Sequence, residues 1–249
     1  MRTVYLKCTG VDRYLSFETP DLMKVRDRIE TIKHVPSRHC AKYLYLIDGR
    51  ISEAVGRKAP SDKGSAARGP RGRDVSFQEY DGEEVALFNV YTSKREGTLR
   101  ICALPLNSVY EPWTREIAEY FDRFDRDNHV FPFNRGKVWR ECRSAWEGLV
   151  YPIENYKVIE VDLKGNVILN ENGKKKSKTI TRHTRPFNLH AIRHIRATDL
   201  VVYYGFNGPN LSAFAGWTLS TAMQVSSSIN KYVSLDWRSY FHKLLKKRF

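Results

Sequence analysis

The sequence lacks the two features that would carry a protein into or across a membrane. It has no run of about 18 apolar residues, the length that a membrane-spanning helix needs. Its first residues, Met1 to Cys8, contain neither the apolar stretch nor the small-residue cleavage site of a secretory signal. We therefore expect a protein that stays inside the cell, in the cytoplasm, with no membrane partner.

Cysteine is scarce and scattered. The four cysteines, Cys8, Cys40, Cys102 and Cys142, are far apart and form no CxxC pair, so we expect reduced, structural thiols. No cluster of Asp, Glu and His stands at metal-ligand spacing either, which disfavours a metal-dependent nuclease. The sequence therefore predicts a protein that uses no metal and no organic cofactor.

Charge of one sign is in clear excess. Lys and Arg number 42 against 28 Asp and Glu, which gives a net charge of +14 and an isoelectric point near 9.6. We expect a negatively charged partner, and nucleic acid is the leading candidate because neutralised phosphates release counterions. An anionic membrane is the weaker alternative, since the basic residues are spread over the chain and not gathered in one amphipathic tail.

The first half of the chain predicts helices followed by a small antiparallel sheet. Apolar residues at helical spacing indicate helices over 21–33 and 38–47, separated at Pro36, and a short helical opening over 50–55. Strands are expected over 75–80, 85–93 and 98–106, with turns at Asp81-Gly82 and Glu96-Gly97. This arrangement places Lys94 at the tip of a hairpin.

The second half predicts helices around a second hairpin. Helical spacing returns over 111–126 and 135–149, and from residue 188 to the end, where 233–249 forms an amphipathic helix. The hairpin, with strands 157–163 and 167–169, turns at Lys164-Gly165-Asn166. The 249 residues allow one large domain or two small ones, and we expect one α+β domain, 1–249, in which 156–185 is a hairpin insertion.

Two stretches are rich in basic residues. Residues 56–74 have no hydrophobic period and predict a mobile basic loop, which either lies along a phosphate backbone or is a solvated linker. Residues 172–185 add six further Lys and Arg to the hairpin insertion. Both stretches are candidates for gripping DNA.

A His-x-x-Arg pair is the first clue to chemistry. His190 and Arg193 are three residues apart on a predicted helix, so an imidazole and a guanidinium can meet one anion. The pair alone is weak, because such pairs also occur by accident on basic helices. Its weight comes from its company, which in chain order is Arg50 in Gly49-Arg50-Ile51-Ser52-Glu53, Lys94, the His190/Arg193 pair, Gly216-Trp217 and Tyr232.

This ordered set resembles the catalytic domain of tyrosine recombinases, the phage and archaeal integrase family. Trp217 follows Arg193 by 24 residues, a spacing similar to that of the glycine-histidine or glycine-tryptophan step of the family. The resemblance covers about residues 20–249 and implies a mostly helical catalytic fold with a small antiparallel sheet. It implies a site-specific recombinase or integrase of an archaeal, viral or plasmid type, acting on double-stranded DNA in the nucleoid or in the cytoplasm of a host cell.

The resemblance also implies a role for each residue of the set. Arg50 and Arg193 would fork onto the non-bridging oxygens of the scissile phosphate, a geometry that lysine cannot reproduce. Tyr232 would attack phosphorus and form a 3′-phosphotyrosine bond, and Lys94 would protonate the departing 5′ oxygen. His190 would serve as acid or base near the nucleophile, and Trp217 would add an N–H donor and a packing wall. Glu53 would orient the arginine or the histidine.

The chain departs from the family pattern in two places. Tyr232 stands 15 residues after Trp217, farther than in most members, and Tyr240 is the alternative nucleophile, although its helical pattern indicates a buried face. Fewer than 50 residues precede Arg50, so we expect no separate N-terminal DNA-clamping domain. A separate accessory protein that bends or clamps DNA is a possible partner.

Assembly and reaction class leave alternatives open. The helix over 233–249 packs either on its own core or, as the family implies, on a neighbouring subunit of a tetramer assembled on paired sites. A type IB topoisomerase uses a similar set of residues to relax one duplex. A basic DNA-binding protein without chemistry, in which the motifs are accidents, is the alternative from another class.

Overall fold

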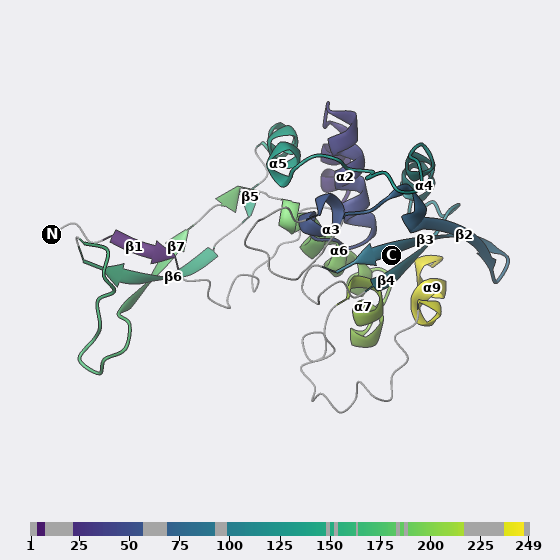
Figure 1. The fold of residues 1–249 in the computed structure, drawn as a ribbon. Coiled ribbons are helices and arrows are strands. Elements are labelled where there is room, and N and C mark those ends of the chain that lie inside the picture. The colour runs from purple at the N-terminus through teal and green to yellow at the C-terminus, as the bar shows by residue number, and fades with distance from the viewer. Residues whose placement is uncertain are drawn as a thin grey trace. The chain divides into compact units, whose positions relative to one another are not determined.

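The computed structural model describes residues 4–7, 22–56, 69–92, 99–147, 150–151, 154–162, 164–182, 185–186, 189–216 and 237–246. The chain divides into a small unit, Met1–Pro20 with Trp146–Phe187, and a large unit, Asp21–Ala145 with Asn188–Phe249. The expected hairpin insertion, 156–185, belongs to the small unit. Figure 1 labels the helices and strands of both units.

Helix α2, Val35–Leu46, is the centre of the large unit. It contacts α1 (Leu22–Glu30), α3 (Ile51–Val55), α4 (Thr114–Asp122), α5 (Arg135–Arg143) and α6 (Leu189–Val202). Every residue from His39 to Leu46 is buried. Pro36 stands in the first turn of α2, where its missing N–H costs no hydrogen bond, and Nδ1 of the N-cap residue His34 accepts from Ser37 N at 3.3 Å. The two expected helices are confirmed, but Pro36 lies inside the second and not between them.

A three-stranded antiparallel sheet packs beside these helices (Figure 1). Its strands run in the order β2 (Val75–Tyr80), β3 (Glu83–Tyr91) and β4 (Leu99–Pro105). Asp81 and Gly82 join β2 to β3 with φ angles of 57° and 76°, the left-handed values that a two-residue hairpin turn requires. The expected strands and their first turn are confirmed, and the turn at Glu96-Gly97 lies outside the described residues.

An aromatic core joins α2 to this sheet. The ring of Tyr43 lies 5.9 Å from Phe88 and 5.3 Å from Phe121, between centroids, and these rings are fully or almost fully buried. Helix α4 supplies Phe121 and β3 supplies Phe88, so the helix–sheet interface is built from edge-on and tilted ring contacts. Cys40, Cys102 and Cys142 are buried free thiols, as the sequence predicts, and Cys8 lies outside the described residues.

The remaining helices of the large unit are shorter than the sequence pattern predicts. The patterns over 111–126 and 135–149 yield α4, α5 and the 3₁₀ turn η2, Ser144–Trp146. Of the basic stretch 56–74, residues 57–68 lie outside the described part, and 72–74 form a second 3₁₀ turn, η1, with Asp74 buried. The end of that stretch is therefore a short 3₁₀ turn.

The C-terminal helix packs on its own chain. Helix α9, Arg238–Leu244, buries Tyr240, Phe241 and Leu244 and contacts β4 and α7 (Gly208–Ala215). The Tyr240 hydroxyl accepts from the Ala103 amide and donates to the Ile101 carbonyl, both at 3.1 Å. The apolar stripe of 237–246 is thus covered by the large unit, and the rest of the expected helix 233–249 lies outside the described residues.

The small unit holds a different arrangement from the one expected. Strand β6, Glu154–Val161, pairs with β1 (Val4–Lys7) on one side and with β7 (Ser177–Arg182) on the other. A second pair joins β5 (Val150–Tyr151) to β8 (Arg185–Pro186). The expected turn at 164–166 is present, since the amides of Asp162 and Ile168 donate to the carbonyls of Asn166 and Glu160, both at 2.9 Å. The expected partner strand 167–169 is reduced to single bridges, Val161 to Val167 and Leu169 to Lys175. The main partner of β6 is the basic tract, whose Thr179, Ile180 and Thr181 are β-branched and favour a strand.

These elements make the protein an α+β fold with small antiparallel sheets. None of the helices among the described residues has both the length and the apolar character to cross a membrane.

Candidate active site

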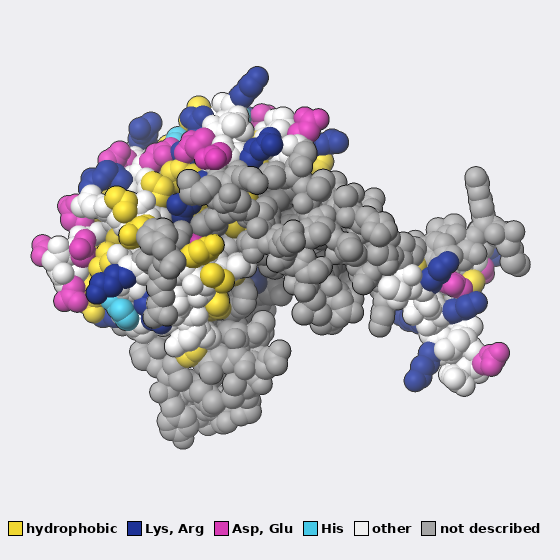
Figure 2. Space-filling view, turned by 180° about the vertical axis from the view of Figure 1, so that it is seen from behind, with side chains coloured by type: hydrophobic (Ala, Val, Ile, Leu, Met, Phe, Trp, Pro, Cys, Tyr) yellow, Lys and Arg dark blue, Asp and Glu magenta, His cyan; other side chains and the backbone are white. Residues whose placement is uncertain are grey.

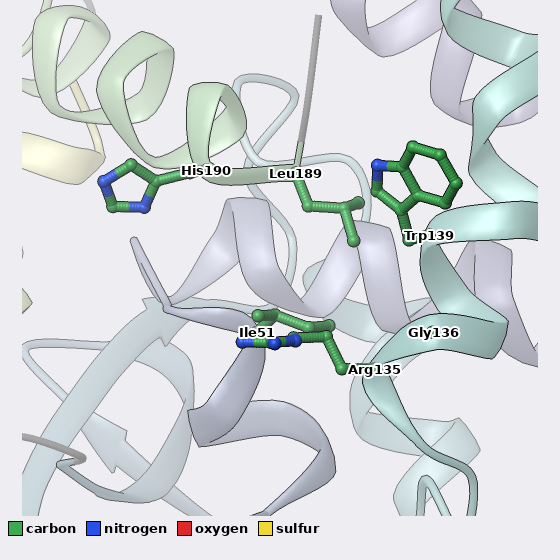
Figure 3. A pocket seen from close by; sticks show the side chains of 6 residues that line it. All are labelled: Ile51, Arg135, Gly136, Trp139, Leu189 and His190. Carbon is green, nitrogen blue, oxygen red and sulfur yellow. The ribbon is translucent and has the colours of Figure 1, made fainter. Parts of the chain in front are cut away.

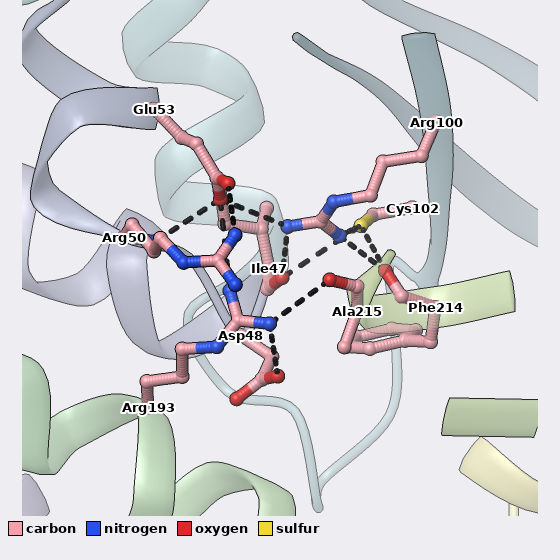
Figure 4. A network of polar contacts seen from close by, with 9 residues as sticks. All are labelled: Ile47, Asp48, Arg50, Glu53, Arg100, Cys102, Arg193, Phe214 and Ala215. Carbon is pink, nitrogen blue, oxygen red and sulfur yellow. Dashed lines mark hydrogen bonds and ion pairs between the residues drawn. The ribbon is translucent and has the colours of Figure 1, made fainter. Parts of the chain in front are cut away.

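Arg50 is held at the start of α3 by Glu53. Its backbone N–H donates to Glu53 Oε2 at 3.0 Å, and its guanidinium Nη1 donates to Glu53 Oε1, also at 3.0 Å (Figure 4). Glu53 occupies the third helical position, from which a glutamate side chain can return to the N-cap residue. The Gly-Arg-Ile-Ser-Glu spacing therefore orients Arg50 through both its backbone and its side chain, and 22% of that side chain remains exposed.

Arg193 reaches the same carboxylate from a distant part of the chain. It lies in the second turn of α6, and its Nη1 is 3.8 Å from Glu53 Oε2. Its Nη2 donates to the Ala215 carbonyl at 3.0 Å and lies 3.6 Å from Asp48 Oδ2 (Figure 4). The two arginines that the motifs single out are thus brought together around Glu53. Arg193 is only 2% exposed, however, so a phosphate reaches it only after the surrounding groups move.

A third arginine, Arg100, completes this group. It stands on β4 and is buried, and its Nη2 donates to the Ile47 carbonyl at 2.8 Å and to Glu53 Oε2 at 3.4 Å. Its Nη1 donates to the Phe214 carbonyl and to Cys102 Sγ. Sequence reasoning missed Arg100. The available signal was its alternation with Cys102 and Leu104, which places it on the buried face of the strand.

The Arg50 cluster, defined as Asp48, Arg50, Glu53, Arg100 and Arg193, carries an excess of positive charge. Three guanidinium groups face two carboxylates, and arginine stays protonated in proteins. Burial pulls the pKa of Glu53 upward, but Arg100, Arg193 and the bond from the Arg50 backbone outweigh it and hold the pKa below its usual value. Burial raises the pKa of Asp48 to about 6, although Arg193 opposes the shift. At neutral pH the three guanidinium groups therefore exceed the two carboxylates of the cluster by at least one charge.

His190 lies beside the cluster in the first turn of α6. It is exposed and lines a pocket of about 270 Å³, together with Ile51, Arg135, Gly136, Trp139 and Leu189 (Figure 3). In Figure 3 the side chains of Leu189 and Trp139 point toward each other, whereas the His190 ring points away from them. Since Ile51 follows Arg50 in the chain, the pocket and the cluster are neighbours at the start of α3.

Gly216 ends α7 at a point where the backbone conformation and the close neighbours disfavour a side chain. Its φ is +66°, and a Cβ built there would lie 3.0 Å from Arg100 Cδ and 3.3 Å from Thr92 Cγ2. This close approach brings the chain that leads into Trp217 against Arg100. Trp217, Lys94 and Tyr232 themselves lie outside the described residues, so the structure places three of the six predicted site residues: Arg50, His190 and Arg193.

Tyr240, the alternative nucleophile, is fully buried. Its hydroxyl bridges two backbone groups of β4, as described above, which explains its place on the apolar face of α9. The prediction that Tyr240 lies on a buried face is confirmed. Tyr240 therefore has a structural role, since its buried hydroxyl bonds the backbone of β4.

Another buried arginine, Arg196, forms a separate network. Arg196, with Tyr45, Glu111, Asp199 and Tyr204, makes the Arg196 cluster. Its guanidinium donates to both oxygens of Glu111 at 2.9 and 3.0 Å and to Asp199 Oδ2 at 3.0 Å. The hydroxyls of Tyr204 and Tyr45 donate to Glu111 at 2.6 Å and to Asp199 at 3.1 Å. Every charged side chain of this cluster is fully or almost fully buried and hydrogen-bonded.

The surface charge differs between the faces that can be inspected. On the large unit, Figure 2 shows Lys and Arg interspersed with Asp and Glu. On the small unit, the segment 164–178 carries exposed lysines, namely Lys164, Lys174, Lys175, Lys176 and Lys178. On the face of the large unit that Figure 2 shows, the described basic residues therefore form no single broad patch.

The described residues contain no group of three or more His, Cys, Asp and Glu side chains placed to hold a metal ion. Comparisons of the sequence and of the fold found no matching family model, curated protein or solved structure.

Proposed function

We propose that this protein is a tyrosine recombinase, which cleaves and rejoins double-stranded DNA through a 3′-phosphotyrosine intermediate. The observation that carries the proposal is the meeting of Arg50 and Arg193 around Glu53, although 143 positions separate them in the chain. A buried cluster with more guanidinium groups than carboxylates is suited to an anion, and the scissile phosphate is the anion that the motif order implies.

The proposed reaction divides the work between charge and proton transfer. The Tyr232 Oη attacks phosphorus, the bond to the 5′ oxygen breaks, and the protein becomes linked to the 3′ phosphate. The phenolic proton passes to His190, and Lys94 supplies the proton that the departing 5′ oxygen takes up. Arg50 and Arg193 stabilise the added charge on the non-bridging oxygens, work that a divalent metal performs in many nucleases. Resealing reverses these steps and needs no ATP.

Phosphate binding requires a local rearrangement in this proposal. Arg50 is accessible to a phosphate, whereas Arg193 is buried and bonded to the Ala215 carbonyl. A phosphate that reaches Arg193 must displace its contacts with Ala215 and Asp48. Because the Asp48 contact measures 3.6 Å, it is weaker than a close ion pair and is the easier of the two to exchange.

A covalent adduct tests the proposal. The substrate is a library of nicked duplexes with randomised sequence beside the nick, incubated in EDTA, so that cleavage releases a short fragment and traps the linked protein. We expect a DNA-linked band from the wild-type protein and none from Tyr232→Phe. Tyr203→Phe, a substitution of a partly exposed tyrosine outside the proposed site, serves as the control and keeps the band.

The outcomes separate the alternatives. A wild-type protein that binds the library but forms no adduct in EDTA is a non-catalytic DNA-binding protein, and the proposal fails. An adduct accompanied by relaxation of any supercoiled plasmid, without exchange between paired sites, indicates a type IB topoisomerase. Recombination of paired sites selected from the library is the result that we expect, and it would involve a tetramer on DNA.

A further inference from the structure

We infer that Arg100 is a positioning residue of the proposed active site, because its guanidinium joins the separate segments on which that site is built. The inference rests on the proposed function and assigns a role to a residue that the motif set does not contain. Arg100 touches no phosphate in this account. Arg100 acts through the carbonyl and carboxylate groups to which it donates hydrogen bonds.

The contacts of Arg100 connect three parts of the chain. The Ile47 carbonyl belongs to the turn that leads through Asp48 into Arg50. Glu53 Oε2, 3.4 Å from Arg100 Nη2, belongs to the carboxylate that orients Arg50 and faces Arg193. The Phe214 carbonyl lies in the last turn of α7, just before Gly216 and Trp217. Figure 4 shows the guanidinium between these acceptors.

The strand that carries Arg100 adds a fourth connection. Arg100 pairs with Val90 across β3 and β4, and Thr92 continues from β3 toward the expected position of Lys94. Gly216 approaches both side chains, because a Cβ there would meet Arg100 Cδ at 3.0 Å and Thr92 Cγ2 at 3.3 Å. The end of β3 and the end of α7 thus meet at Gly216, beside the Arg100 side chain.

The chemistry of this position requires arginine. The planar guanidinium offers five donors in a fixed fork, so one residue can bond acceptors on different sides. A lysine keeps the charge but has a single nitrogen, which cannot reach the Ile47 and Phe214 carbonyls together in the same geometry. Replacement by lysine should therefore loosen the segments relative to one another while a positive charge still faces Glu53.

The test compares Arg100→Lys with Arg196→Lys, since both replace a buried arginine in the large unit. Adduct formation is followed in single turnover with the trapped nicked duplex recovered from the library, at saturating DNA and at a temperature where each protein is folded. DNA affinity and the melting temperature are measured on the same samples. A misplacement of about 1 Å can cost about 100-fold in rate, and we expect a loss of that order for Arg100→Lys with DNA affinity within about threefold of wild type.

Arg196→Lys should show the opposite behaviour. We expect a lower melting temperature and an adduct rate within about threefold of the wild-type rate, because the Arg196 cluster bonds none of the groups that Arg100 holds. Equal rate losses in the two variants, or a wild-type rate in Arg100→Lys, would overturn the inference and leave the proposed function standing. A wild-type protein that forms no adduct overturns the proposed function and this inference together.

A pair of glycine variants keeps the inference testable if Arg100→Lys does not fold. Gly216→Ala and Gly82→Ala both place a side chain at a positive φ, but only the Cβ at position 216 meets Arg100, whereas nothing lies within 4 Å of the one at 82. We expect similar losses of melting temperature and a large loss of adduct rate in Gly216→Ala alone. Equal adduct rates in the two glycine variants would contradict the role of Arg100.

Discussion

The two arginine clusters of the large unit both combine guanidinium and carboxylate groups, but the number of these groups and the distances between them differ. In the Arg196 cluster one guanidinium meets two carboxylates at 2.9 to 3.0 Å, and two tyrosine hydroxyls donate to oxygens that the guanidinium also reaches, Glu111 Oε1 and Asp199 Oδ2. In the Arg50 cluster three guanidinium groups share two carboxylates, and Arg193 lies 3.6 and 3.8 Å from them. Arg196 thus makes close bonds to both of its carboxylates, whereas Arg193 lies farther from its own, and the guanidinium groups of the Arg50 cluster outnumber its carboxylates.

Close ion pairs and looser ones contribute differently to a buried cluster. A buried network of close ion pairs stabilises one arrangement of helices, because removing a member leaves an uncompensated charge. A cluster with an excess of one charge gains from a ligand of the opposite charge and is stabilised by it. Burial alone does not distinguish the clusters, since Arg193 and Arg196 are 2% and 0% exposed. The number of charged partners and their distances distinguish the two clusters.

The largest expected effect concerns stability. Arg196→Met leaves Glu111 and Asp199 buried without their cation, so we expect a loss of about 3–5 kcal/mol in the free energy of unfolding. Arg193→Met should cost less, because Glu53 keeps Arg50 and Arg100 as partners and Asp48 can take up a proton. Urea denaturation of the two variants measures the difference. Equal losses in the free energy of unfolding would contradict this difference between the two clusters.

A smaller effect is expected in the pH dependence of stability. Burial raises the pKa of Asp48 from 3.8 to about 6, so between these values the folded state holds a proton that the unfolded chain releases. The free energy of unfolding therefore falls as the pH rises through this window, by at most about 3 kcal/mol. Asp48→Asn does not titrate there and should lack this fall.

The comparison of wild type with Asp48→Asn isolates this group from other acids. The pKa of Glu53 is lowered, and the pKa of Glu116 falls to about 2 through its bonds with His39 and Lys42, so both contribute stability that is lost at lower pH. Their contributions are common to both proteins and cancel in the difference. If the difference in the free energy of unfolding between the two proteins stays constant from pH 4 to pH 6.5, burial does not raise the pKa of Asp48.

Local pattern predicted much of this fold, because helices and strands leave a period in the sequence. Pro36 and the Asp81-Gly82 turn also act within a few residues of themselves. Strand β1 was missed because its four residues pair with 158–161, and nothing local marks that partner. The tract 172–185 was interpreted by its charge, although its β-branched residues favoured the strand β7.

The candidate site shows the same limit. Motif spacing identified Arg50, Glu53, His190 and Arg193, and the structure brings Arg50 and Arg193 around the carboxylate of Glu53. Arg100 and Asp48 carry no motif. A strand arginine reads as an ordinary surface residue unless its acceptors, at positions 47, 53 and 214, are known to lie beside it. In the sequence Asp48 resembles an ordinary turn residue, and its raised pKa follows from its burial in the fold.

The central claim is that Arg50 and Arg193 act on one phosphate, and a double-mutant cycle tests it most directly. The rate of adduct formation at saturating DNA is measured for Arg50→Lys, for Arg193→Lys and for the double variant. We expect each single variant to lose about 100-fold or more, and the double variant to lose little beyond the more impaired single, because residues that act as a unit are not additive. Losses that multiply in the double variant would contradict a shared phosphate.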